Sequence, residues 1–184
     1  MDNANENISI RHSIPADARL ISVLATTTFY EAYCEQDESD NLAGYISQSF
    51  DVHKIESELA DPSVIFLLIY RSNKAVGYAK LDKESTLDCI AGPAPIELKR
   101  IYILERVYGK GFGARLLEYC IDLAKNLGFE TIWLQVWEEN PRAQRFYQKY
   151  GFKQCGKIDI PYGEVTGTNL VLQKSLIIRA ETRV

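Results

Sequence analysis

The chain has few of the residues that most directly reveal a metal or redox function. Its 184 residues include four cysteines, two histidines and one methionine. The cysteine spacing matches neither a zinc site nor a dense disulfide framework. His12 and His53 have no neighbouring ligands or catalytic partners in the sequence. We therefore expect no metal cofactor.

An excess of basic charge and a long apolar segment are also missing. The chain has 21 Lys and Arg residues against 25 Asp and Glu residues, which argues against a nucleic-acid-binding protein. The longest apolar run, 64–70, is too short to cross a bilayer. The polar N-terminus lacks the basic and apolar segments of a signal peptide. These absences predict a cytoplasmic protein that binds neither nucleic acid nor membrane.

The residues that are present predict a single domain over 1–184, with 46% hydrophobic residues. Leu20, Val23, Leu24 and Thr27 mark the expected apolar face of the first helix. A loop containing Pro161, Gly163 and Gly167 is expected to join the last two strands. The patterns predict strands at 8–12, 64–70, 75–81, 96–104, 131–137, 152–158 and 169–176, and helices at 16–33, 41–59 (one or two), 112–127 and 141–150.

This order predicts an α/β (α+β) fold with a central mixed sheet flanked by helices. Hairpins make most of the sheet antiparallel, whereas helix crossovers make strands 96–104 and 131–137 parallel to each other. Within the strand 96–104, strict alternation would put Glu97, Ile101 and Ile103 on one face.

The most informative segment is a glycine-rich turn between the strand 96–104 and the helix 112–127. Gly109, Gly111 and Gly113 alternate there. Such a turn directs several backbone N–H groups to one point, beside the positive end of a helix dipole. Glycine also leaves room for a ligand close to the backbone. The turn is therefore a candidate site for a phosphate or pyrophosphate group.

The turn is open to two other interpretations. Gly109-x-Gly111-x-x-Ala114 also fits the dinucleotide pattern G-x-G-x-x-A. The preceding strand carries Glu97, Lys99 and Arg100, however, and a dinucleotide fold would bury that strand on both faces. The second interpretation is that the glycines only form a tight turn.

The segment resembles the acetyl-CoA-binding region of the GNAT N-acetyltransferases. The family signature, Gln/Arg-x-x-Gly-x-Gly/Ala, falls on Tyr108-x-x-Gly111-x-Gly113, with Tyr in place of Gln or Arg. Downstream, WLQVWEENPRAQRFYQKYGF is similar to the strand, Asn-containing loop and Tyr-bearing helix of the family. The resemblance covers about 96–152. The segments TFYEAY, VGYAKL, ELKRIYI and WLQVWEEN look closest to polyamine acetyltransferases of the PaiA type.

The resemblance implies acetyl-CoA as co-substrate. It further implies that the two parallel strands part after Ile103, so that backbone groups there bind the pantetheine arm, and that the glycine turn binds the pyrophosphate. Lys110 and Arg115 either add charge or are solvated surface cations. The cofactor-binding residues expected on this basis are Ile101, Tyr102, Ile103, Tyr108, Gly109, Lys110, Gly111, Phe112, Gly113, Ala114, Asn140 and Tyr147.

The implied reaction, attack of an amine on a thioester, needs a base and an acid. Glu97 is the candidate base; the alternative is a carboxylate that faces solvent or pairs with Lys99. Many family members carry Glu at the position of Gln135, and Gln cannot act as a base, so a water-relayed route is also open. Tyr147 is the candidate acid for the leaving thiolate, as in the family; the alternative is a core aromatic residue.

Aromatic and acidic side chains suit a cationic small-molecule amine as acceptor. The candidates are Tyr30, Tyr33, Tyr78 and Glu38. A protein N-terminus or lysine is an alternative acceptor, and a CoA-binding sensor without turnover is an alternative function. A homodimer, common in the family, is also open.

Overall fold

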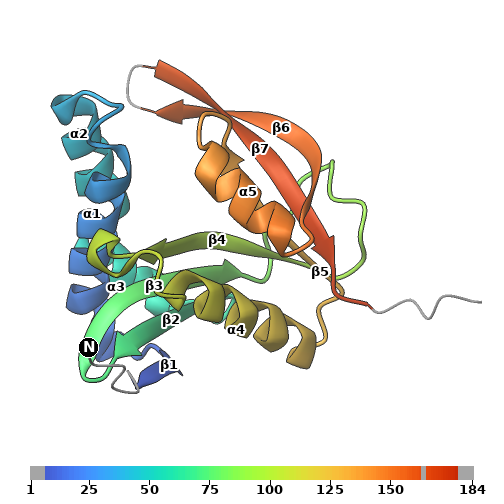
Figure 1. Ribbon diagram of the computed structural model, residues 1–184, viewed down its shortest axis with the longest axis horizontal. Coiled ribbons are helices and arrows are strands. Elements are labelled where there is room, and N and C mark those ends of the chain that lie inside the picture. Colours follow the sequence, from blue (N-terminus) through green and yellow to red (C-terminus); the bar gives the residue numbers. More distant parts are fainter. Residues whose placement is uncertain (1–6, 163–164, 178–184) are drawn as a thin grey trace, which may run out of the picture.

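A computed structural model describes residues 7–162 and 165–177 of the chain. Within these residues, seven strands form one mixed sheet in the order β1-β2-β3-β4-β5-β7-β6 (Figure 1). The strands are β1 (Ile8–His12), β2 (Val64–Arg71), β3 (Lys74–Asp82), β4 (Pro95–Ile103), β5 (Thr131–Trp137), β6 (Lys153–Tyr162) and β7 (Val165–Ser175). The helices are α1 (Ala18–Tyr33), α2 (Ser39–Ser49), α3 (Val52–Ala60), α4 (Phe112–Asn126) and α5 (Pro141–Lys149), with 3-10 turns η1 (Pro15–Asp17) and η2 (Glu105–Val107).

The predicted mixed, mostly antiparallel sheet is confirmed. β4 and β5 run parallel, and the other neighbouring strands of the described sheet run antiparallel. The pairing of β4 with β5 ends where Glu97 lies opposite Trp133. The two strands therefore part after Glu97, and the expectation that they part after Ile103 is wrong. A β-bulge at Lys99 adds local twist to β4, which accounts for the early divergence.

The bulge at Lys99 also changes which face Glu97 occupies. Arg100 pairs with Lys80 and Glu97 pairs with Asp82, so Lys99 is the extra residue on β4. Partners across an antiparallel pair point to the same face. Glu97 therefore shares a face with Arg100, and the expectation that it shares one with Ile101 and Ile103 is wrong.

Helices cover both faces of the sheet. α1 packs on the face of Tyr102, where the Phe29 ring centroid lies 6.3 Å from that of Tyr102. α4 and α5 lie on the other face: a Cβ on Gly113 would be 3.8 Å from Ile103 and 4.0 Å from the ring of Phe146. In Figure 1, α1 to α3 are grouped at the left, and α4 and α5 lie in front of the sheet. No helix in the described part of the chain has the length and apolar character needed to cross a membrane.

The predicted apolar face of α1 is only partly right. Leu24 is buried, but Leu20 and Val23 are 36% and 63% exposed. The ring of Phe29, stacked on Tyr45 at 4.7 Å, turns the helix so that a neighbouring stripe faces the sheet. That stripe consists of Ala18, Ile21, Leu24, Ala25, Thr28 and Phe29.

The predicted loop between the last two strands is shorter than expected. Pro161 pairs with Thr166 and Ile160 pairs with Gly167, so both ends of the expected loop belong to the ladder. β6 is one of the two edge strands of the described sheet, and an edge strand tolerates proline because it has one side without ladder partners. Gly163 lies outside the described residues.

Two glycines allow a test of the packing between β3 and β4. A methyl group at Gly77 would overlap the carbonyl oxygen of Tyr102, whereas a methyl group at Gly44, inside α2, would meet no atom within 4 Å. We expect Gly77→Ala to lower the free energy of unfolding by about 2–3 kcal/mol. We expect Gly44→Ala to raise it by up to about 1 kcal/mol. Urea denaturation measures both, and equal stabilities would contradict the described register.

Candidate active site

The glycine turn depends on backbone conformation rather than on crowding. Gly109 and Gly111 have φ angles of 74° and 85°, a region that side chains with a Cβ rarely adopt. A Cβ at either position would meet nothing within 4 Å. Gly111 is the N-cap of α4 and provides no side chain to bind the first amides of the helix. The space next to the turn is thus open to a ligand.

The amides of this turn are largely unused by the protein. Arg115 N donates to Gly111 O at 3.0 Å, and Lys110 N donates to Val107 O at a long 3.4 Å. No backbone partner is seen within the described residues for the amides of Gly109, Gly111, Phe112, Gly113 and Ala114. These groups lie together at the positive end of a 15-residue helix.

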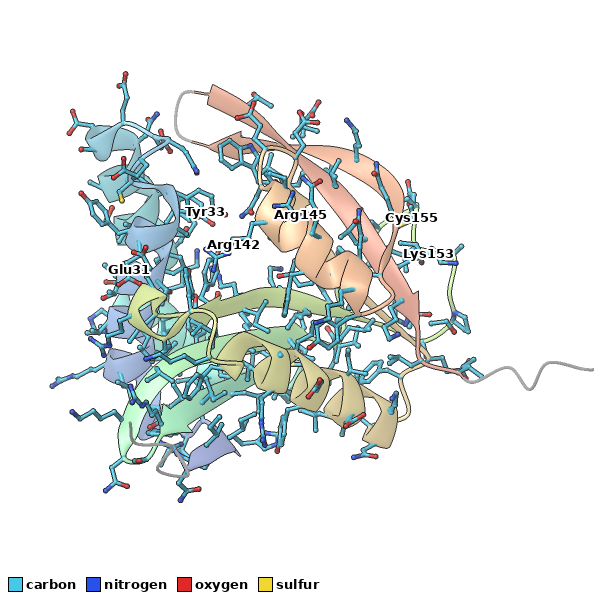
Figure 2. All side chains as sticks on the ribbon, in the orientation of Figure 1. Glu31, Tyr33, Arg142, Arg145, Lys153 and Cys155 are labelled. Carbon is cyan, nitrogen blue, oxygen red and sulfur yellow. The ribbon has the colours of Figure 1, made fainter. Side chains whose placement is uncertain are left out.

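Tyr108 connects the turn to α5. The guanidinium of Arg142 lies 4.3 Å from the centroid of the Tyr108 ring, a cation–π contact. Arg142 therefore puts a positive charge next to the signature position at which this chain has Tyr instead of Gln or Arg. Figure 2 shows Arg142 of α5 and Tyr33 of α1 in the space between these helices. Lys110 is exposed on the turn itself.

Asn140 and Tyr147 are held by α5 and its cap. The Asn140 side chain accepts a hydrogen bond from Ala143 N at 3.0 Å, so the residue caps α5. Tyr147 is 8% exposed and packs against Phe146 and Phe152. Burial raises the pKa of Tyr147 well above its usual value, and electrostatic interaction with Tyr33 raises it further. Tyr147 therefore keeps its proton throughout the neutral range.

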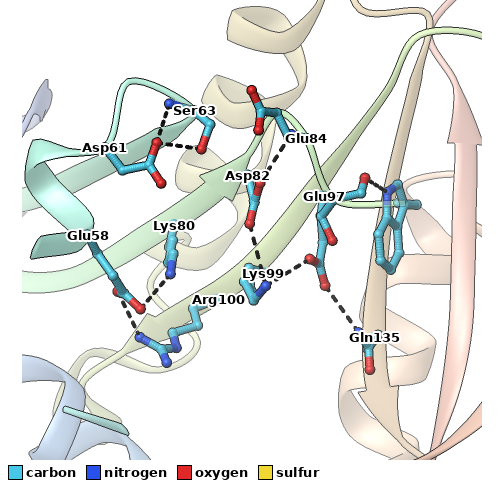
Figure 3. A network of polar contacts seen from close by, with 12 residues as sticks. Glu58, Asp61, Ser63, Lys80, Asp82, Glu84, Glu97, Lys99, Arg100 and Gln135 are labelled. Atoms are coloured by element: carbon cyan, nitrogen blue, oxygen red, sulfur yellow. Dashed lines mark hydrogen bonds and ion pairs between the residues drawn. The ribbon is translucent and has the colours of Figure 1, made fainter. Parts of the chain in front are cut away.

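Glu97 is buried at the point where β4 and β5 part. Only 2% of the residue is exposed. Its Oε1 accepts a hydrogen bond from Gln135 Nε2 at 3.2 Å, and Asn169 Nδ2 donates to Gln135 Oε1 at 3.4 Å. Its Oε2 lies 3.5 Å from Lys99 Nζ (Figure 3). The carboxylate is thus paired with Lys99, as the alternative interpretation held, but it does not face solvent.

Aromatic side chains line the same face of the sheet. Tyr78 and Tyr102 stack with centroids 6.0 Å apart, and the Tyr33 ring lies 5.9 Å from that of Trp137. Tyr33 and Tyr102 share a hydrogen bond, and burial raises the pKa of both. Tyr78 is fully buried in the core, and its hydroxyl has no hydrogen-bond partner in the described structure.

The other two acceptor candidates lie apart from this cluster. Tyr30 is 49% exposed on α1, and Glu38 is exposed at the N-cap of α2. Neither makes a described side-chain contact with the aromatic group. The structure thus brings together Tyr33, Tyr78, Tyr102 and Trp137, and only the first two of these were predicted as acceptor residues.

A second polar network occupies this face further from the parting of the strands. Glu58 of α3 lies 2.8 Å from Lys80 Nζ and 3.6 Å from Arg100 (Figure 3). Arg100 also lies over the ring of Phe50, 4.9 Å from its centroid. The Lys80 side chain is 4% exposed, and burial lowers the pKa of Lys80 despite the opposing effect of Glu58. This network neutralises buried charge under α3.

Sequence reasoning anticipated Lys99 as a partner of Glu97 but missed Asp82, which shares Lys99, and Asn169, which supports Gln135. The pairing of Asp82 with Glu97 depends on the register between β3 and β4 and on the bulge, and neither is visible in the residue pattern. Within the described residues, no group of three or more His, Cys, Asp or Glu side chains is arranged to hold a metal ion.

Known proteins resemble this chain over most of its length. Residues 25–152 match the family model described as acetyltransferase (GNAT) family. An uncharacterised N-acetyltransferase of Lactobacillus delbrueckii subsp. lactis is 24% identical over 154 residues, which cover 84% of this chain and 89% of that protein. The spermine/spermidine N(1)-acetyltransferase of Bacillus subtilis (strain 168) is 33% identical over 92 residues, or 50% of this chain and 60% of that protein.

A solved structure supports the same fold. PaiA N-acetyltransferase from Thermoplasma acidophilum, in complex with coenzyme A, superposes with a TM-score of 0.74 and 20% sequence identity, covering 92% of this chain and 99% of that one. The family model spans more than half of the sequence. This chain therefore belongs to the GNAT acetyltransferase family, and with it to the acyltransferases.

The bond between Gln135 and Glu97 gives a prediction about stability. Gln135→Leu removes the donor and leaves Glu97 Oε1 buried without a partner, so we expect a loss of about 1–3 kcal/mol in the free energy of unfolding. Asn169→Ala leaves that bond in place, and the loss should be smaller. Urea denaturation near pH 7 distinguishes the two, and a Gln135→Leu variant as stable as the parent would contradict the described bond.

Proposed function

We propose that this protein transfers the acetyl group of acetyl-CoA to a primary amine, and that the acceptor is a small polyamine-like molecule. One observation carries the proposal: amides at the start of α4 that have no backbone partner among the described residues lie next to β4, whose described pairing with β5 ends at Glu97. A diphosphate fits the first feature and an extended amide-bearing arm fits the second.

The cofactor assignment uses residues of β4, the turn and α5. The backbone of Ile101, Tyr102 and Ile103 would bind the pantetheine arm in the manner of an added strand. The amides of Gly109 to Ala114 would bind the pyrophosphate, with Lys110 and Arg142 supplying positive charge. Asn140, which caps α5, and Tyr147 would complete the site on the other side of the gap between β4 and β5.

Acetyl-CoA, when bound, supplies the acetyl group as an activated thioester. An alkylamine has a pKa of about 10.4, so near pH 7 only roughly one molecule in 2,500 is unprotonated. Glu97 would take the proton, directly or through water. Tyr147, which burial keeps protonated, would give a proton to the leaving sulfur. The two groups come from opposite layers of the fold, Glu97 from the face under α1 to α3 and Tyr147 from α5.

The acceptor proposal rests on chemistry and on relatives. The Bacillus relative is a spermine/spermidine acetyltransferase by name, and the Thermoplasma neighbour is of the PaiA type. Carboxylates and aromatic rings, including Tyr33, lie on the face that Glu97 occupies, and both suit a cationic amine.

The cofactor assignment is tested by calorimetric titration with CoA. We expect the parent and Gly44→Ala to bind with equal affinity. Gly111→Val should bind at least about tenfold more weakly, because a branched side chain at a φ of 85° forces the turn to redirect its amides. Pantetheine, which lacks the phosphates, should show a smaller difference between the variants. A parent protein that does not bind CoA would remove the proposal.

The catalytic roles are tested by two conservative substitutions. Tyr147→Phe and Glu97→Gln should each lower kcat by about 10²–10⁴-fold. Glu97→Gln should leave the Kd for CoA unchanged, because Glu97 is outside the cofactor site. Tyr147→Phe should raise that Kd far less than it lowers kcat, because the glycine turn keeps its contacts. Turnover is measured as CoA release, with spermidine, spermine, amino acids and peptides as acceptors. Activity on peptides alone would exclude the polyamine acceptor, and CoA binding without turnover on any acceptor would favour a sensor.

A further inference from the structure

Two carboxylates from neighbouring strands converge on one point. Asp82 at the end of β3 pairs with Glu97 of β4 across the sheet. Asp82 Oδ2 and Glu97 Oε2 each lie 3.5 Å from the same atom, Lys99 Nζ (Figure 3). An ammonium group already sits at this point, supplied by the chain itself.

The protein fixes the other oxygen of each carboxylate. Asp82 Oδ1 accepts a hydrogen bond from Glu84 N at 3.1 Å, and Glu97 Oε1 accepts one from Gln135 at 3.2 Å. Asn169 in turn supports Gln135 at 3.4 Å. The two remaining oxygens are therefore oriented independently of Lys99.

Glu97 Oε2 is a buried acceptor without a full partner. The residue is 2% exposed, and this oxygen makes no hydrogen bond within the described structure, since the contact with Lys99 is a longer ion pair. A buried carboxylate oxygen in this state favours any donor that can approach more closely. Glu97 Oε2 can therefore accept a hydrogen bond from a cationic donor that comes closer than Lys99.

Lys99 is a weakly held occupant. It lies at the bulge of β4, and its side chain is 41% exposed. The long lysine side chain loses conformational freedom in making these contacts, and both contacts are long at 3.5 Å. A cation arriving from solvent can replace the lysine, which then moves out into water.

We propose that Asp82 and Glu97 form the ammonium-recognition site of the acceptor, and that Lys99 occupies it as a tethered competitor which the substrate displaces. This inference rests on the proposed function and names the substrate class: a primary alkylammonium without a nearby anionic group. An α-amino acid would bring its own carboxylate beside Asp82 and Glu97, and like charges repel.

The site joins recognition to proton transfer. A bound ammonium donates to both free oxygens at once. When the covalent N–H bond directed at Glu97 Oε2 breaks, the proton binds that oxygen and forms the O–H of a carboxylic acid, while the electron pair of the N–H bond stays on nitrogen. Asp82 stays ionised and holds the amine in place.

The inference is tested by titrating the protein with 1,4-diaminobutane in a calorimeter, with and without saturating CoA. Lys99→Met removes the competing charge and keeps an unbranched side chain, so its Kd for the diamine should fall about two- to fivefold. Asp82→Asn, added to Lys99→Met, should raise the Kd about tenfold or more. Lys83→Met changes a neighbouring lysine that has no described contact with either carboxylate, and it should match the parent.

Two further measurements test whether Lys99 competes with the diamine and whether the site excludes an amino acid. Lys99→Arg retains the charge and offers a fork of donors to both carboxylates, so its Kd for the diamine should rise. Glycine should not compete with the diamine. An unchanged or higher Kd in Lys99→Met, or competition by glycine, would overturn the inference. A loss of kcat in Lys99→Met at an unchanged KM would also overturn it, because Lys99 would then act by positioning Glu97.

The failure of this inference can be distinguished from the failure of the proposed function. A parent protein that binds CoA and the diamine, with affinities that ignore Lys99 and Asp82, contradicts the ammonium site alone. A parent protein that does not bind CoA contradicts the cofactor assignment whatever the diamine does.

Discussion

The rest of the site depends on the end of hydrogen bonding between β4 and β5. The two strands are parallel neighbours for only 95–97 and 131–133. Beyond that point the inner edge of β4 lacks ladder partners from β5, although unpaired backbone groups are costly to bury. A sheet with such a gap at its centre is stable only where water or a ligand can bind the freed groups. The glycine turn, Tyr147 and Glu97 are all arranged around this gap, so one interruption of the ladder sets the position of the whole site.

The bulge at Lys99 is the second constraint, and it acts through one residue. An extra residue on β4 moves Glu97 from the face of Ile101 to the face of Asp82 and Arg100. Without it, the carboxylate would point toward α4 and α5, into the same layer as Tyr147. With it, the proposed base and the proposed acid lie on opposite faces of the sheet, so that in the proposed reaction the amine and the leaving sulfur need not share one approach.

The sequence predicted those features that depend on local chemistry. The alternating glycines, the apolar stripe of α4 and the Asn140-Pro141 cap each depend on a few adjacent residues, and the turn and both helices lie where these residues place them. The position of the gap and the bulge could not be predicted in this way, because both arise from pairing between distant strands. The face of α1 was mispredicted for a related reason: Leu20 and Val23 fit a helical stripe as well as Ile21 and Phe29 do, and only packing against the sheet decides between them.

Two lysines on the same face of the sheet differ in how firmly their carboxylate partners hold them. Lys80 and Lys99 each pair with a carboxylate, but the side chain of Lys80 is 4% exposed and lies 2.8 Å from Glu58, whereas that of Lys99 is 41% exposed and lies 3.5 Å from its partners. Breaking a buried pair costs about 3–5 kcal/mol, because it leaves an uncompensated charge in the interior. Lys99 can return to solvent when another cation binds its carboxylates, so that exchange leaves no buried charge uncompensated. An incoming amine can therefore compete for the carboxylates that Lys99 holds and has no means of displacing Lys80. The same interaction type thus fixes α3 to the sheet at one end of this face and leaves a cation site open to exchange at the other.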